Sequence, residues 1–444
     1  MVNRVSRLGE LALLYGSRAA GVLVSLVFIP LYASLLGASD FGWVALILSA
    51  QALMMTLDLG MSALIARDLA TGLTPAAALA RWRNAERLLL FQFAALLALS
   101  LGLAVITGWS APAVAGCAVL FWTVTAQNVA QSAMLALGEV RQAALVQGLG
   151  VLVRAGLTAA TLLWIDTSLR GFIISQLVGA LCHLMLNRQL GQRRLSAARV
   201  AGTADVEPLA RLARRGLPLF LVGAMGAAVM QVDKLLIGAF MGANAVSPYF
   251  LAGTYCLVPI AVLASPVAQF FQPPVIRAHA AGDADALRRR AHQLTVALLI
   301  AVIVPTLALW LFREPLIGIW LSDQALASEV AALAAIMLPA AAIGAVGYVP
   351  LALLGALGDF AFQARFSVLL TLLTLVGVAW AASRGGLFAI CWIYLGYYVA
   401  LTSTLWLRAA SHSTTRLPAR RGAMWMLGAV LLATTPVAIW VHSR

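Results

Sequence analysis

The sequence predicts an all-α integral membrane protein with two parallel six-helix lobes around a central cavity and a thirteenth helix at the C-terminus. Three observations support this prediction. Of the 444 residues, 62% are hydrophobic and only 10% are charged. Apolar runs long enough to cross a bilayer follow one another along the chain, and short patterns recur in the same order in its two halves. Soluble proteins carry about 25% charged residues, so this composition excludes a soluble fold.

A basic interval from Asn187 to Leu217 sets the predicted orientation. Its arginines are Arg188, Arg193, Arg194, Arg199, Arg211, Arg214 and Arg215. Because arginine-rich loops are retained on the cytoplasmic side of membranes, we place this interval in the cytoplasm. With the N-terminus also cytoplasmic, most of the 30 Lys and Arg residues fall on that side. Membrane topology then explains the net charge of +14, and no soluble domain remains to bind nucleic acid.

About 20 apolar residues make one crossing, which gives thirteen predicted spans. Those before the basic interval are Leu11–Leu35, Phe41–Ala66, Leu88–Ile106, Ala113–Leu137, Ala143–Ile165 and Gly171–Leu186. Those after it are Pro218–Met241, Pro248–Phe271, Leu294–Phe312, Val330–Leu354, Phe366–Ala382, Phe388–Leu407 and Met424–Val441. The predicted parts are an N-terminal lobe (1–187), a basic cytoplasmic linker (188–217), a C-terminal lobe (218–408), and a basic loop with the extra span (409–444).

The two halves share three short patterns. The matched pairs are Leu36–Ser39 with Met241–Asn244, Ala136–Glu139 with Ala356–Asp359, and the loop Arg67–Arg87 with the loop Arg277–Arg290. Each half has an even number of spans, so both enter the membrane from the same side and form parallel repeats. In transporters, such repeats enclose a substrate site between the lobes near the membrane midplane.

Charged residues within spans are the first candidates for function, because each costs roughly 2.5–3.5 kcal/mol to insert and requires a partner or water. Arg18 and Asp58 lie about 10–13 Å from the same membrane face at the helical rise, so they form either a fixed ion pair or a gating pair. Arg154 lies near the midplane with no in-span carboxylate on its own helix. We therefore expect it to face a hydrated cavity.

Asp233 and Lys234 are adjacent in the seventh span, so their side chains are expected to point about 100° apart. They are not expected simply to face each other across a helix turn, and one of them is expected to need a partner elsewhere. Lys234 is the only lysine in the chain. An ammonium can lose its proton where a guanidinium cannot, which makes it a candidate switch, although pairing with a neighbouring span or snorkelling is also open. Three amides of the fourth span, Gln127, Asn128 and Gln131, either bind sugar hydroxyls or join helices.

Two stretches of the sequence resemble a known family. The first contains Pro30-Leu31-Tyr32, Leu36-Gly37, Asp40-Phe41-Gly42, Leu57-Asp58-Leu59-Gly60-Met61 and Arg67. The second is Gln231-Val232-Asp233-Lys234-Leu235-Leu236-Ile237-Gly238. Both are similar to motifs of the polysaccharide or O-antigen flippases of the multidrug/oligosaccharidyl-lipid/polysaccharide exporter (MOP) superfamily. The similarity extends over roughly the twelve-span body.

The resemblance implies a flippase that moves a polyprenyl-pyrophosphate-linked oligosaccharide across the bacterial inner membrane by alternating access. It implies membrane lipids and glycan polymerase or export machinery as partners. A cation or proton would be coupled through Asp58, Asp233 and Lys234. A cavity lined by Arg18, Arg154 and Lys234 with the span-four amides would hold pyrophosphate and sugar, without a metal or other cofactor.

Two alternatives remain at this stage. A drug/cation antiporter of the same superfamily would favour acidic residues within its spans, whereas Arg18, Arg154 and Lys234 outnumber the in-span acids Asp58 and Asp233. A membrane enzyme of polysaccharide assembly would need a large outer loop with catalytic residues. The longest outer interval, Arg313–Glu329, offers no such group, and no phosphate-binding loop for ATP is present. We therefore predict a transporter and not an enzyme.

Overall fold

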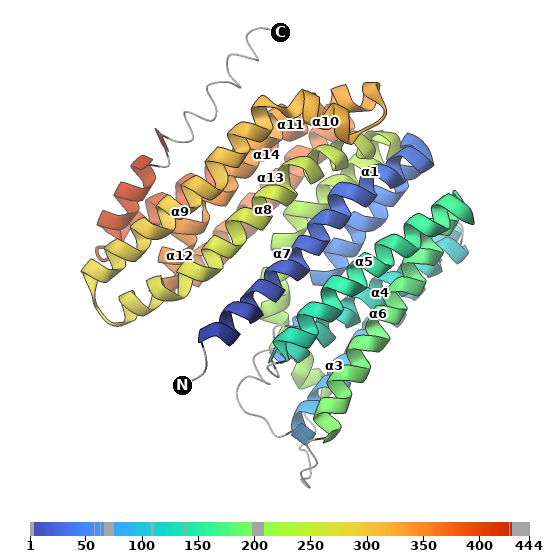
Figure 1. Cartoon of the computed structure of the whole chain (residues 1–444), viewed down its shortest axis with the longest axis horizontal. Helices are drawn as coiled ribbons and strands as arrows, with labels where there is room; N and C mark the ends of the chain where they lie inside the picture. The colour runs from blue at the N-terminus through green and yellow to red at the C-terminus, as the bar shows by residue number, and fades with distance from the viewer. Residues whose placement is uncertain are drawn as a thin grey trace. The chain divides into compact units, whose positions relative to one another are not determined.

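The structure is a computed structural model of the chain. It describes residues 4–56, 58–62, 64–65, 75–107, 111–136, 139–197, 208–425 and 427–428. Every regular element within these residues is a helix, as Figure 1 shows, so the predicted all-α class is confirmed. The chain forms two compact units, Met1–Leu235 (unit 1) and Leu236–Arg444 (unit 2).

The helices are long, as membrane-spanning segments must be. Unit 1 holds α1 (Arg4–Thr56), α3 (Pro75–Thr107), α4 (Ala111–Ala136), α5 (Val140–Trp164), α6 (Leu169–Ala197) and most of α7 (Leu209–Met241). Unit 2 holds α8 (Ala243–Ala280), α9 (Ala284–Leu311), α10 (Arg313–Trp320), α11 (Gln324–Val346), α12 (Tyr348–Leu357), α13 (Phe360–Ser383) and α14 (Leu387–Ser411). The basic interval is thus helical at both ends, because α6 continues to Ala197 and α7 begins at Leu209.

Within the described residues, 10 helical stretches are long and apolar enough to cross a membrane. The chain is therefore a multi-pass membrane protein. One of these stretches, Leu26–Met55, bridges the first two predicted spans, and Gln324–Leu357 contains the tenth across α11 and α12. The thirteenth predicted span, Met424–Val441, lies almost entirely outside the described residues.

Backbone geometry supports the internal repeat. Gly37 interrupts α1 with φ 74° and ψ 171°, so α1 consists of two helical segments. Its partner in the first pattern, Gly242, separates α7 from α8 with φ 84°. Glycine is favoured at both positions because positive φ is strained for other residues. In the second pattern, Glu139 N donates to Met134 O and Asp359 N donates to Leu354 O, both at 3.1 Å.

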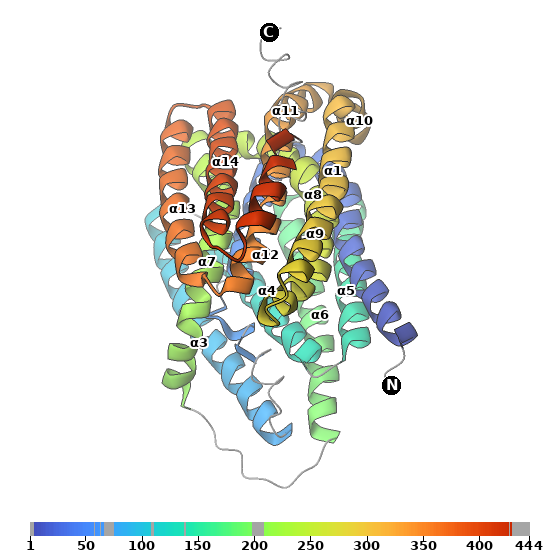
Figure 2. The ribbon, with the colours of Figure 1, turned by 90° about the vertical axis from the view of Figure 1, so that its left-hand side faces the viewer.

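The packing of unit 1 is shared by two central helices, α4 and α5, whereas unit 2 is packed around one, α11. In unit 1, α4 packs against α3 and α6, and α5 packs against α1 and α6. Their core includes Trp82, Leu89, Val129, Ala133 and Leu212. In unit 2, α11 packs against α8, α9 and α14, and it is buried from Val330 to Val346 except at Gly344. Figure 2 shows α13 beside α14. Small side chains such as the alanines of α11 allow such close approach between membrane helices.

Candidate functional site

Arg154 lies in unit 1 where α5 packs against α6. A Cβ atom added at Gly179 of α6 would come within 2.8 Å of Arg154 Cγ, so the arginine stem crosses α6 at a residue without a side chain. Arg154 is half-buried, and its charge acts on Tyr32 of α1 and on His183 of α6. Among the residues that the structure describes, no carboxylate forms an ion pair with it.

His183 occupies the reciprocal position on the same pair of helices. A Cβ atom added at Gly150 of α5 would come within 2.4 Å of the His183 ring. Gly150 and Arg154 are one helical turn apart on α5, as are Gly179 and His183 on α6. Each helix therefore offers a glycine to the polar side chain of the other. We call this contact between Arg154, His183 and their two glycines the α5–α6 seam.

The hydroxyl and amide groups around the seam are neutral. The Tyr32 hydroxyl donates to Ala155 O at 2.8 Å, so it carries its proton. Thr158 donates to Arg154 O at 3.0 Å. In turn, Thr158 Oγ1 accepts from Gln176 Nε2 at 3.0 Å and from Ser175 Oγ at 3.1 Å. Among these described neighbours there is no negative charge to balance the guanidinium.

The three predicted amides of α4 differ in what they contact. Gln127 Nε2 lies 3.4 Å from both Gln147 Oε1 and His183 Nε2, which places it at the edge of the seam. Asn128 instead donates to Met55 O at 3.2 Å and to Ser62 Oγ at 3.1 Å. Gln131 donates to Ala143 O at 3.1 Å. Gln127 thus lies beside His183 of the seam, whereas Asn128 and Gln131 tie α4 to neighbouring segments, as the helix-joining alternative anticipated.

Asp58 forms a turn in the structure. Its carboxylate accepts from Gly60 N at 2.9 Å and from Ser62 N at 2.8 Å. Leu59, which lies between Asp58 and Gly60, has a positive φ of 55°. Side-chain acceptors of this kind satisfy the free N–H groups at a helix start. The predicted partner Arg18 lies in α1, but its side chain is outside the described residues, so the gating role of Asp58 stays a prediction.

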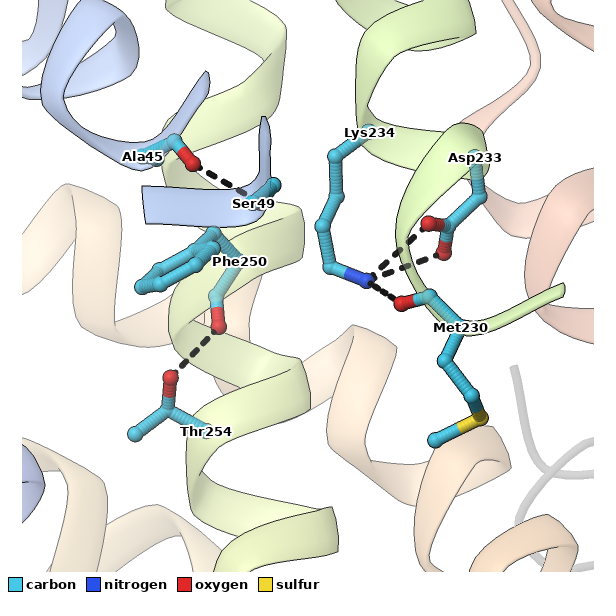
Figure 3. Close-up of polar contacts among 7 residues, drawn as sticks. All are labelled: Ala45, Ser49, Met230, Asp233, Lys234, Phe250 and Thr254. Atoms are coloured by element: carbon cyan, nitrogen blue, oxygen red, sulfur yellow. Dashed lines mark hydrogen bonds and ion pairs between the residues drawn. The ribbon is translucent and has the colours of Figure 1, made fainter. Parts of the chain in front are cut away.

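Asp233 and Lys234 contact each other directly, and the prediction that they could not do so was wrong. Lys234 Nζ lies 3.0 Å from Asp233 Oδ1 and donates to Met230 O at 2.5 Å. Figure 3 shows both contacts. The four-carbon stem of lysine bends back along α7, so the angle between the two Cβ atoms does not decide the contact. Both residues are buried, and the charge of Lys234 is offset locally in a way that the charge of Arg154 is not.

Two further ion pairs join helix ends and were not predicted. In unit 1, Arg188 Nη2 lies 2.9 Å from Glu86 Oε2. In unit 2, Arg408 Nε donates to Asp359 Oδ2 at 2.7 Å, and His412 Nε2 lies 3.4 Å from the same oxygen. The hydrogen bond from Arg408 holds the pKa of Asp359 below its usual value. These ion pairs leave only a weak signal in the sequence, because the two residues of each pair lie far apart along the chain.

No three His, Cys, Asp or Glu side chains lie close enough to hold a metal ion within the described part of the chain. The arrangement of unit 1 instead offers a guanidinium, a histidine and neutral amides. Such groups can bind an anion and the hydroxyls attached to it.

Comparison with known proteins identifies the family. The sequence profile of a family described as polysaccharide biosynthesis protein matches residues 31–330, more than half of the chain. The chain belongs to this family. The resemblance to polysaccharide flippases drawn from its two motifs is thereby confirmed. No curated protein matches this member of the polysaccharide biosynthesis family at a significant level.

Solved structures share the fold of this polysaccharide biosynthesis protein. An inward-facing multidrug resistance MATE family transporter of the MOP superfamily has a TM-score of 0.65 at 15% identity, over 89% of this chain and 94% of that one. A MOP superfamily transporter from Pyrococcus furiosus, described as having a binding pocket of reverse polarity, has a TM-score of 0.64 at 14% identity, over 96% of this chain and 95% of that one. A MATE transporter mutant from Vibrio cholerae has a TM-score of 0.61 at 14% identity, over 91% of this chain and 96% of that one. The chain therefore shares its fold with transporters of this superfamily.

Proposed function

We propose that this protein is a flippase for polyprenyl-pyrophosphate-linked oligosaccharide. In this proposal it moves the lipid-linked glycan from the cytoplasmic to the outer leaflet of a bacterial inner membrane, with its own N-terminus in the cytoplasm. Transport proceeds by alternating access. Membrane lipids and the glycan polymerase or export machinery are its partners.

One observation carries the proposal: Arg154 lies inside a membrane-spanning unit without an ion pair to any described carboxylate. The groups beside it are polar but uncharged: Thr158 donates to its backbone carbonyl and accepts from Gln176, and Gln127 lies 3.4 Å from His183. Placing an arginine within the membrane is expensive, so its retention there requires a compensating interaction. The pyrophosphate of a lipid-linked glycan supplies negative charge, and a guanidinium binds phosphate oxygens in a two-pronged geometry.

The remaining predicted residues take secondary roles. Arg18 and Lys234 add positive charge to the cavity, and Asn128 and Gln131 line it in one state of the cycle or fix α4 in all states. Asp58 and Asp233 couple transport to a cation or proton. Their contacts favour a structural contribution as well, since Asp58 accepts two backbone N–H groups and Asp233 is paired with Lys234.

A drug/cation antiporter is the second candidate because solved MATE transporters share the fold. Its substrate would need a carboxylate in the binding site, whereas the α5–α6 seam presents a cation. A membrane enzyme of polysaccharide assembly is less well supported, because the interval Arg313–Glu329 consists of the short helix α10 and the first turns of α11.

The test is transport of a fluorescent polyprenyl-pyrophosphate oligosaccharide in proteoliposomes that contain the purified protein. Quenching from outside reports the leaflet in which the glycan lies. We expect the wild-type protein to move the glycan. Arg154→Ala should insert normally but abolish movement, and Lys234→Ala should do the same when it is combined with Asp233→Asn, which removes the buried charge that Lys234 offsets. Arg170→Ala, which removes an exposed arginine at the start of α6, serves as the matched control. Wild-type rates in both cavity variants would refute the assignment, and movement of an organic cation instead of the glycan would favour the antiporter.

A further inference from the structure

The chain turns back along α14 after that helix ends. Residues 416–425 are helical, and Figure 2 draws them in dark red beside α9 and α14. Thr415 Oγ1 donates to Ala409 O of α14 at 2.6 Å. Ala419 N donates to Thr415 O at 2.9 Å and begins the new helix. We call residues 416–425 the basic helix, because its charged residues are all arginines.

One side of the basic helix is packed against the rest of unit 2. Its small residues Pro418, Ala419 and Gly422 are buried there. A Cβ atom added at Gly422 would lie 2.6 Å from the Trp406 ring of α14 and 3.4 Å from Thr295 Oγ1 of α9. The basic helix is therefore seated on α9 and α14, and its opposite side faces away from the protein.

That opposite side carries both cations and large apolar side chains. The cations are Arg416, Arg420 and Arg421, which are exposed and form no ion pair with any described residue. The apolar residues are Leu417 and Met424, which are 55% and 66% exposed. At about 3.6 residues per turn, these two lie between Arg420 and Arg421 around the helix. An apolar strip is thus bordered by guanidinium groups on both sides.

The strip lies where the apolar parts of the neighbouring helices end. Along α9, His292 is the last basic residue before the apolar part, and Thr295 follows it by one turn. Along α14, Arg408 follows the apolar part, two residues past Trp406. Because Gly422 packs against Thr295 and Trp406, the three arginines that precede it lie at this boundary. Lipid headgroups occupy the same level of a membrane.

This combination fits a phospholipid better than a soluble anion. Guanidinium groups bind phosphate oxygens, and the apolar strip between them is suited to acyl chains. A zwitterionic lipid also carries an ammonium group that the arginines repel, so a lipid with a net negative charge is favoured. Each arginine near an anionic membrane surface strengthens association by about fivefold.

We propose that the basic helix is a binding surface for an anionic phospholipid of the surrounding bilayer. Arg416, Arg420 and Arg421 hold the headgroup, and Leu417 and Met424 contact the acyl chains. In the orientation proposed above, the lipid belongs to the cytoplasmic leaflet. The surface lies in unit 2 and does not depend on what the protein transports, so it goes beyond the flippase function.

The experiment identifies the lipid that touches this surface in the full-length protein. Benzoylphenylalanine takes the place of Leu417, or of Val376 in a control, a residue of α13 that is 69% exposed. Each protein is irradiated in nanodiscs of phosphatidylcholine with a minority of phosphatidylglycerol, and its lipid adducts are counted by mass spectrometry. At Leu417 we expect phosphatidylglycerol at least about fivefold above its share of the bilayer, the contribution of one arginine. At Val376 we expect its bulk share. Bulk share at both positions, or equal enrichment at both, overturns the proposal.

Variants and salt assign the enrichment to the arginines. Arg416→Gln, Arg420→Gln and Arg421→Gln together should return the adducts at Leu417 to the bulk share. The same three changes to Lys should keep most of the enrichment, because attraction to a charged surface needs the charge and not the planar geometry. Arg384→Gln, which removes an exposed arginine at the other end of α13, should have no effect. Enrichment that survives in a folded triple Gln protein overturns the proposal.

A second measurement uses the protein with its arginines intact, so it decides even where the triple Gln protein does not fold. In about 1 M sodium chloride the screening length falls to about 3 Å, and the enrichment at Leu417 should be largely lost. Enrichment that does not change with salt overturns the proposal. Competition by inorganic phosphate at constant ionic strength would show a site for a soluble anion, and that result also overturns it. None of these outcomes depends on glycan transport, so the flippase and the lipid surface fail separately.

Discussion

Replacing Gly150 with alanine tests the geometry of the α5–α6 seam most directly. The added Cβ would lie 2.4 Å from two atoms of the His183 ring and 2.5 Å from a third. The ring is rigid and only 3% exposed, so it cannot move aside without displacing α6. Overpacking of this kind costs about 1–3 kcal/mol. Gly156→Ala on the same helix is the control, because nothing lies within 4 Å of its new Cβ.

The assay is the free energy of unfolding in mixed micelles, measured by tryptophan fluorescence as denaturing detergent is added. Both variants gain the same helix propensity from alanine, so Gly150→Ala should be less stable than Gly156→Ala by about 1–3 kcal/mol. His183→Ala removes the clashing ring, so Gly150→Ala should cost little stability in a protein that already carries His183→Ala. The two changes must then be strongly non-additive. Additivity within about 0.5 kcal/mol would show that the residues do not touch, and the seam would be wrong.

Three further predictions concern the charged residues. Asp58→Ala should cost about 0.5–2 kcal/mol of stability, the usual loss at a helix cap. Asp58→Asn keeps an acceptor and should be nearly as stable as wild type. Loss of transport in a stable Asp58→Asn protein would instead support coupling through the carboxylate. Lys234→Met removes the cation beside buried Asp233 and should destabilise the protein by about 3–5 kcal/mol. Adding Asp233→Asn to the same chain should largely reverse this loss. Thermal unfolding of the two variants measures both effects. The pKa of Asp359 is lower in the folded protein than its usual 3.8, so its contribution to stability is present above that pH and is lost as the pH falls through the lower folded value. Unfolding from pH 6 to 3 should therefore separate wild type from Asp359→Asn at the upper end and bring the two together at the lower end; a constant difference would contradict the Arg408 pairing.

Hydropathy predicted where the helices lie but not how far they extend. The sixth predicted span stopped at Leu186, whereas α6 continues to Ala197. A helix that projects from the membrane into water is no longer apolar, so an apolar window cannot follow it. The break at Gly37 was visible because a turn pattern recurred in both halves. The all-α class and the course of the spans could therefore be predicted, and the helix ends could not.

The candidate site was predictable only in part, for a related reason. Arg154 stood out because an arginine in an apolar run is expensive. His183 did not, because a histidine in a span is common enough and the glycine beneath it, Gly150, lies on another helix. The spacing Gly150 to Arg154 and Gly179 to His183 was the available signal. Sequence spacing shows which residues share a helix face, but the contact between two faces comes from packing.

The repeat itself argues that the seam is a functional addition to the scaffold. When the offset that matches Glu139 to Asp359 is applied to the rest of α5, Gly150 corresponds to Leu370 of α13 and Arg154 corresponds to Thr374. Thr374 donates to Leu370 O at 2.7 Å within its own helix, which is an ordinary way to satisfy a hydroxyl in a membrane helix. Helix α13, the counterpart of α5 in the repeat, therefore has neither a cation at the position of Arg154 nor a glycine one turn before it. If Arg154 only joined helices, Arg154→Thr should be tolerated in α5 as threonine is in α13. We expect this variant to insert and fold while losing glycan transport, and a transport-competent Arg154→Thr protein would show that the arginine is dispensable.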